Sequence, residues 1–169
     1  MGIFKKHKNG KEKIMDSIID VNDFIEKNKN KKIVFTNGVF DMVHKGHIEV
    51  LEYSKSLGDI LIVGINSDIS VKMIKGENRP IMDLNNRVAV LKSIKYVDFV
   101  IPFDEKSPVE LIEKINKIDI YVKGGDYNLN NLPEREVLEK KNTEIRFFNF
   151  KTKISTTEIV KKITQNFCK

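Results

Sequence analysis

Cysteine and long apolar segments are scarce in this chain. The single cysteine, Cys168, excludes a disulfide framework within the chain and a zinc site built on several cysteines, and such usage is typical of a reducing compartment. No apolar run approaches the ~20 residues that a membrane-spanning helix needs, and the basic N-terminus lacks the apolar stretch of a secretory signal. We therefore expect a cytoplasmic protein with no membrane partner, and 169 residues suit one domain.

Positive charge is concentrated at the N-terminal end. The formal net charge is +6, and residues 1–32 contain nine lysines but only five acidic residues. A nucleic-acid-binding arm is one interpretation of such a tail. Because the tail has no arginine and almost no aromatic residues, we favour a solubilising extension and expect no nucleic-acid partner. We accordingly predict a basic extension with one helix over residues 1–30 and a domain over residues 31–169.

Apolar periodicity alternates between that of strands and that of helices along the chain. The pattern predicts strands at 32–40, 59–66, 97–103, 119–126 and 144–150, and helices at 13–27, 47–58, 85–95, 107–116, 133–141 and 155–167. Strands that are apolar on both faces indicate a parallel sheet covered by helices, which is an α/β doubly wound fold. Ligands of such folds bind beyond the carboxyl ends of the strands, which is where every unusual motif of this sequence falls.

The stretch T-N-G-V-F-D-M-V-H-K-G-H, residues 36–47, joins the first strand of the predicted domain to a helix. Gly38 permits close approach of a ligand to the backbone, and Gly46 lies where free amides and the helix dipole favour an anion. His44 and His47 can donate hydrogen bonds to phosphoryl oxygens as charge develops in a transition state. The alternative is that one histidine caps the helix and the other packs in the core. The combined pattern favours a phosphate site.

Three further segments follow strands and contain polar or small residues. In residues 66–81, Lys72, Lys75 and Arg79 surround Gly76, which suits a phosphorylated substrate, although a solvated loop would also explain them. In V-K-G-G-D-Y, residues 122–127, two glycines permit approach to a ring or sugar, and a plain turn is the alternative. In I-S-T-T, residues 154–157, three hydroxyls crowd the first turn of a helix, where Ser155 is the expected cap.

These motifs resemble a known superfamily. The string N-G-V-F-D-M-V-H-K-G-H is similar to the signature of the H-x-G-H nucleotidylyltransferases, which have Rossmann-like domains and transfer a nucleoside monophosphate from a nucleoside triphosphate to a phosphate. K-G-x-x-R-P-I and V-K-G-G-D-Y resemble the D-glycero-D-manno-heptose 1-phosphate nucleotidylyltransferase branch. One departure is Lys153, where relatives usually have a glycine.

The resemblance implies a role for each matching residue. The catalytic residues would be His44, His47 and Lys75, and the substrate-binding residues Asp41, Lys75, Arg79 and Lys123. Asp41 could instead orient the turn. Arg87 is expected to hold a helix through a salt bridge. The nucleotide would be bound by Thr36, Asn37, Gly38, Val39, Phe40, His44, Gly46, His47, Gly124, Asp126, Ser155, Thr156 and Thr157.

The implied ligands are a nucleoside triphosphate, with ATP expected, and a sugar 1-phosphate. Mg²⁺ would be held mainly by the triphosphate, because no carboxylates cluster into a dedicated metal site. Relatives often form homodimers, and some are fused to a sugar kinase, which here would be a separate protein. One alternative is a sugar product linked to GDP or CDP instead of ADP. Others are the cytidylylation of glycerol 3-phosphate and an FAD synthetase-like reaction, and a non-enzymatic alternative is a nucleotide-binding regulator.

Overall fold

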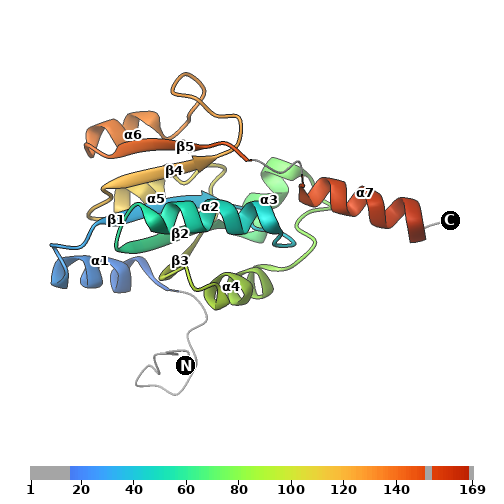
Figure 1. Ribbon diagram of the computed structural model, residues 1–169, viewed down its shortest axis with the longest axis horizontal. Coiled ribbons are helices and arrows are strands. Elements are labelled where there is room, and N and C mark those ends of the chain that lie inside the picture. The colour runs from blue at the N-terminus through green and yellow to red at the C-terminus, as the bar shows by residue number, and fades with distance from the viewer. Residues whose placement is uncertain (1–15, 151–153, 168–169) are drawn as a thin grey trace, which may run out of the picture.

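A five-stranded parallel sheet forms the centre of the protein (Figure 1). The computed structural model describes residues 16–150 and 154–167. The strands lie in the order β3-β2-β1-β4-β5, and each neighbouring pair is parallel. Their bounds are β1 Ile33–Gly38, β2 Ile60–Asn66, β3 Phe99–Phe103, β4 Ile120–Gly124 and β5 Glu144–Phe148. The predicted α/β doubly wound parallel sheet is thus confirmed.

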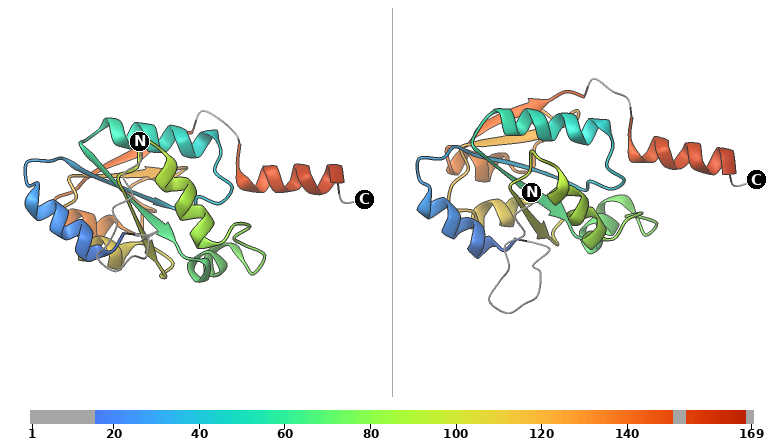
Figure 2. Two further views of the ribbon diagram at one scale, coloured as in Figure 1. Left: turned by 90° about the horizontal axis from the view of Figure 1, so that it is seen from below. Right: turned by 60° about the horizontal axis from the view of Figure 1, so that its bottom comes forward.

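Helices cover both faces of this sheet and alternate with its strands. They are α1 Ile18–Lys27, α2 Lys45–Ser56, α3 Asp68–Lys75, α4 Leu84–Ser93, α5 Val109–Lys114, α6 Arg135–Lys140 and α7 Thr156–Phe167. Helix α7 extends away from the sheet, as both views of Figure 2 show, and it exposes Ile163 and Phe167. None of the described helices is long and apolar enough to cross a membrane.

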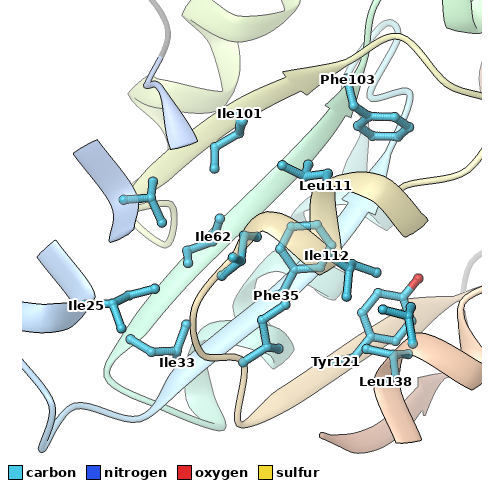
Figure 3. Packing of buried hydrophobic residues seen from close by; sticks show 14 of the residues in the cluster. Ile25, Ile33, Phe35, Ile62, Ile101, Phe103, Leu111, Ile112, Tyr121 and Leu138 are labelled. Atoms are coloured by element: carbon cyan, nitrogen blue, oxygen red, sulfur yellow. The ribbon is translucent and has the colours of Figure 1, made fainter. Parts of the chain in front are cut away.

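The core consists of two apolar layers, because successive strand residues point to opposite faces of the sheet. Ile33 and Phe35 pack in the layer beneath α1, α5 and α6, where Figure 3 shows them beside Ile25 and Ile112. Val34, between them, packs in the opposite layer against α2 and α4. Strands that are apolar on both faces are therefore enclosed on both sides, as the sequence predicted.

The strand order reverses between β1 and β4. The chain proceeds from β1 outward to β3 and then returns to place β4 on the other side of β1. At such a switch point the connections leave the two central strands in opposite directions, which opens a crevice beyond their carboxyl ends. The segments that follow β1 and β4 are those that contain the two most specific motifs.

Two expectations about the N-terminal half need correction or completion. No helix was predicted at 66–81, but α3 occupies Asp68–Lys75, with Ser67 as a cap that accepts from the Ser70 amide at 3.2 Å. The predicted N-terminal helix is present as α1, and its Val21 and Ile25 are buried in the common core. Residues 1–15 lie outside the described residues, so the domain boundary at residue 30 remains a prediction.

Candidate active site

A cavity of about 750 Å³ opens beyond the carboxyl ends of β1 and β4. The predicted site residues that line it are Val39, Phe40, Asp41, His44, His47, Lys75, Arg79, Asp126, Ser155, Thr156 and Thr157. A second cavity of about 170 Å³ shares part of this wall and is lined by Thr36, Asn37, Gly38 and Gly124 as well. The fold therefore brings four sequence segments that are far apart in the chain to one site.

The two histidines are stacked at the start of α2. Their ring centroids are 3.9 Å apart with an interplanar angle of 25°, and the ring of Phe40 lies 5.3 Å from that of His47. The His44 amide donates to Nδ1 of His47 at 3.3 Å. Since Nδ1 is the acceptor, the neutral ring of His47 has its proton on Nε2, and this N–H is the donor available to a ligand.

Burial keeps this imidazole pair uncharged. Desolvation, followed by the effect of the neighbouring His44, lowers the pKa of His47 to about 4, although Asp41 opposes the shift. Burial also lowers the pKa of His44, whose Nδ1 has no hydrogen-bond partner among the described residues. At neutral pH both rings are therefore uncharged, and each can donate a hydrogen bond to an oxyanion bound in the cavity.

Gly46 makes room for this arrangement. A Cβ atom at Gly46 would lie 3.2 Å from Cε1 of His44 and 3.4 Å from Cδ1 of Phe150. The absent side chain thus lets the His44 ring lie against the first turn of α2. The amides of Lys45, Gly46 and His47 belong to this first turn and have no intrahelical acceptor by position, so they can bind an anion together with the imidazoles.

Lys75 and Arg79 approach the cavity from α3 and the segment after it. Arg79 is paired with Asp41, through Nε at 2.9 Å and Nη2 at 2.8 Å from Oδ2. Asp41 is buried and also accepts from the amides of Ile81 and Met82 at 2.8 and 3.0 Å. The geometry therefore gives Asp41 the turn-orienting role and leaves Lys75 as a cation that no described carboxylate pairs with.

The first turn of α7 contributes to the wall of the cavity. Ser155 caps the helix, as predicted, because its Oγ accepts from the Glu158 amide at 3.2 Å. The hydroxyl of Thr156 donates to the carbonyl of Asp41 at 2.6 Å and so attaches α7 to the turn that follows β1. Two helix N-termini, those of α2 and α7, consequently face the same cavity, and their dipoles favour negative charge there.

Comparison with known proteins shows which family has this combination of fold and site. Residues 35–162 match the model of the cytidylyltransferase-like family.

The chain belongs to the cytidylyltransferase-like family. It is 48% identical over 137 residues to the bifunctional protein HldE of Campylobacter jejuni subsp. doylei, which covers 81% of this chain and 29% of the relative. It is 39% identical over 167 residues to the bifunctional protein HldE of Geobacter metallireducens, covering 99% of this chain and 34% of the relative. The chain therefore spans only about a third of the length of these relatives.

A solved structure supports the same assignment. The lipopolysaccharide core biosynthesis protein from Thermoplasma volcanium superposes with a TM-score of 0.58 at 31% sequence identity, over 73% of this chain and 99% of that chain. The resemblance to H-x-G-H nucleotidylyltransferases is thereby confirmed.

Some predicted residues of this cytidylyltransferase-like chain lie outside the cavity walls. Lys123 lines neither cavity, because its ammonium points to Glu134 at 2.9 Å on the far face of the sheet. Thr36 lines the second cavity, but its hydroxyl is engaged within the sheet, where it donates to the carbonyl of Val122 at 2.9 Å. Arg87 forms the expected salt bridge, with Asp68 at 2.6 Å. Lys153 lies outside the described residues.

The structure adds site residues that the sequence did not suggest. Phe150 lines both cavities, and its ring lies so close to β4 that a Cβ atom at Gly124 would be 2.8 Å from it. Asn149 also lines the larger cavity, as do Gly125 and Ile154, which belong to the V-K-G-G-D-Y and I-S-T-T motifs. Phe150 follows β5, the neighbour of β4, and the rule that carboxyl ends of parallel strands meet at one edge could have indicated it.

Proposed function

We propose that this chain transfers AMP from ATP to D-glycero-D-manno-heptose 1-phosphate, giving nucleotide-activated heptose and pyrophosphate. The observation that most supports this function is the stacked pair of neutral imidazoles beside the free amides of α2, at the switch point of a doubly wound sheet. Family membership and the bifunctional relatives support nucleotidylyl transfer in general. The lipopolysaccharide core biosynthesis protein supports a sugar phosphate as the acceptor.

In the proposed reaction, an oxygen of the sugar phosphate attacks the α-phosphorus of ATP. A new P–O bond forms, the bond from the α-phosphorus to the bridging oxygen breaks, and its electron pair leaves on pyrophosphate. Such transfers depend on positioning and on charge neutralisation, and need no covalent enzyme intermediate. His47 would donate from Nε2 to a phosphoryl oxygen, His44 and the α2 amides would hold its neighbours, and Lys75 would offset the growing charge.

The donors present fit a Mg²⁺ ion that is held mainly by the nucleotide. Among the described residues, no group of three His, Cys, Asp or Glu side chains could form a metal cage. Asp41 is committed to Arg79 and two amides, which leaves Asp126 as a lining carboxylate that could reach a metal through water. Bound Mg²⁺ would supply charge neutralisation at the phosphates.

The expected partners follow from the proposed reaction. They are ATP, a sugar 1-phosphate and, earlier in the reaction sequence, a sugar kinase. A cytoplasmic location and a homodimer both stay predictions.

A pyrophosphate-release assay with a matrix of substrates tests the proposed function. The four nucleoside triphosphates are each combined with heptose 1-phosphate, glycerol 3-phosphate and FMN in the presence of Mg²⁺. We expect release with ATP and heptose 1-phosphate to exceed that with every other pair. Release with CTP and glycerol 3-phosphate, or with ATP and FMN, would instead support the alternative enzymes, and ATP binding without any release would support a regulator.

Replacing Lys75 by methionine should lower kcat/KM by roughly 10- to 100-fold, because a charge-assisted contact contributes about 1.5–3 kcal/mol. Lys72 provides a matched control on the same helix, since it pairs with Glu77 at 3.6 Å and does not line the cavity. Lys72→Met should leave kcat/KM within about twofold of the native value. Equal losses in the two variants would indicate general electrostatics and contradict a specific role for Lys75.

A further inference from the structure

A polar cluster centred on a buried ion pair lies beside the cavities, on the face of the sheet that α6 covers. We call Asn37, Tyr121, Lys123, Tyr127 and Glu134 the Lys123 cluster. The ammonium of Lys123 lies 2.9 Å from Oε1 of Glu134 and 3.4 Å from Oδ1 of Asn37, and it is 4.8 Å from the centroid of the Tyr127 ring. Oδ1 of Asn37 also accepts from the Tyr121 hydroxyl at 2.7 Å. This ammonium therefore joins three segments of the chain.

The ion pair at the centre of the cluster is almost completely enclosed. Lys123 is 8% exposed and Glu134 is 1% exposed. Figure 3 shows Tyr121 among the packed apolar side chains, beside Leu138 of α6. Burial, reinforced by the negative charge of Glu134, raises the pKa of Tyr121 well above its usual range, so its hydroxyl keeps the proton that it donates to Asn37. Oε1 of Glu134 is thus engaged by Lys123, whereas its buried Oε2 has no hydrogen-bond partner among the described residues.

The position of the cluster connects it to both turns of the nucleotide site. Asn37 lies one residue before the end of β1, which leads into Val39 and Phe40, and Lys123 lies one residue before the end of β4, which leads into Gly125. Tyr127 and Glu134 lie at the two ends of the connection from β4 to α6. Because Lys123 and Glu134 line neither cavity, any effect that they have on a ligand must pass through these turns or through Asn37, which lines the second cavity.

We propose that Glu134 is a positioning residue, which holds the ammonium of Lys123 so that this side chain fixes the turns after β1 and β4 for nucleotide binding. Lys123 is then a positioning residue as well, and does not contact the sugar phosphate. This inference rests on the proposed function, because it takes these turns to be the nucleotide site.

Breaking the ion pair has a structural effect that must be separated from positioning. Glu134→Gln leaves an ammonium buried without its counter-charge, which is strongly destabilising. Replacing both partners by apolar residues of similar volume is often neutral for stability. The double variant Lys123→Met/Glu134→Met should therefore recover the melting temperature while it still lacks the ammonium that contacts Asn37 and Tyr127.

The test is the affinity for ATP, measured by titration calorimetry well below the melting temperature of every variant. We expect the double variant to melt near the native temperature and to bind ATP roughly 3- to 30-fold more weakly. Tyr121→Phe, which keeps the ion pair and the aromatic packing, should weaken binding by roughly 2- to 10-fold. Glu136→Gln on the same helix, where Glu136 pairs with exposed Lys140, and Tyr96→Phe, whose hydroxyl contacts Glu52, are the matched controls and should bind ATP normally.

Two results would overturn the inference. A double variant that regains both its melting temperature and its native affinity for ATP would show that the ion pair serves stability alone. Normal affinity in Tyr121→Phe and Glu134→Gln, with a loss in Lys123→Met only, would show that Lys123 contacts the ligand itself. Because the measurement is of binding, a chain that binds ATP without releasing pyrophosphate would refute the proposed function and leave this inference standing.

Discussion

Turnover of the His47→Ala variant is expected to fall by roughly 10² to 10³-fold, as on removal of one preorganised donor from an oxyanion site, while the fold remains intact. Nδ1 of His47 is occupied by the His44 amide, so Nε2 is the atom that can reach a phosphoryl oxygen. The ring is partly exposed to the cavity and contributes little to the core that forms around Val50 and Leu51 of the same helix. Single-turnover and steady-state pyrophosphate release would measure the loss.

Two isosteric variants separate the donor from the helix cap. Asparagine at position 47 can accept from the His44 amide as Nδ1 does but provides no group at Nε2, so His47→Asn should be as inactive as alanine. Glutamine places an amide near Nε2, and His47→Gln should recover part of the rate. Higher activity in His47→Asn than in His47→Gln would indicate that the cap, and not the Nε2 donor, is what matters. Circular dichroism confirms that each variant is folded.

The pH profile gives an independent check on the same residue. With a pKa of about 4, His47 is neutral throughout pH 6–8. The kcat/KM should consequently show no decline as pH rises through about 6.5, where an imidazolium of ordinary pKa loses its proton. A decline that is present in the native chain and absent from His47→Gln would show that the protonated ring is the active form.

Strands β1, β2 and β4 could be predicted because most of their residues are buried on both faces of the sheet, and runs of apolar residues indicate such burial. Helix α3 was missed for the opposite reason. Its apolar residues Ile69, Met73 and Ile74 are 64%, 46% and 39% exposed, so the apolar pattern does not record a buried face. Ser67, which caps α3, was the available indication. Phe40 and Met42, both with φ of 50°, adopt a left-handed conformation that no side-chain preference indicates.

Site residues could be predicted where their place in the fold follows from their position at a strand end or helix start. They were harder to predict where their role depends on a side chain that is distant in the sequence. His44, His47, Asp126 and Thr157 all line the cavity because they follow strand ends or begin helices. Lys123 lies inside β4, one residue before Gly124, and alternation turns it to the opposite face of the sheet. Its partner Glu134 is 11 residues away in the sequence, and only the tertiary structure reveals the pair.

Arg87→Met should destabilise the folded chain by at least about 3 kcal/mol, because three carbonyls lose their donor at about 1–3 kcal/mol each. Arg87 is fully buried, and its guanidinium donates to four acceptors. These are the carbonyls of Met82 at 2.9 Å, Val39 at 2.7 Å and Asn66 at 2.8 Å, and the carboxylate of Asp68 at 2.6 Å. Methionine fills most of the volume but leaves the carbonyls without donors. Equilibrium unfolding in urea measures the loss.

Arg135→Met is the matched control, because Arg135 pairs with Glu139 at 2.6 Å on an exposed face of α6, where such pairs contribute less than about 1 kcal/mol. Arg87→Lys should give an intermediate loss, since one ammonium cannot reach all four acceptors. Val39 and Asn66 lie at the carboxyl ends of β1 and β2, so a folded Arg87→Lys variant should also lose activity although Arg87 does not line the cavity. Full activity together with native stability in Arg87→Lys would show that a single cation at this position is sufficient.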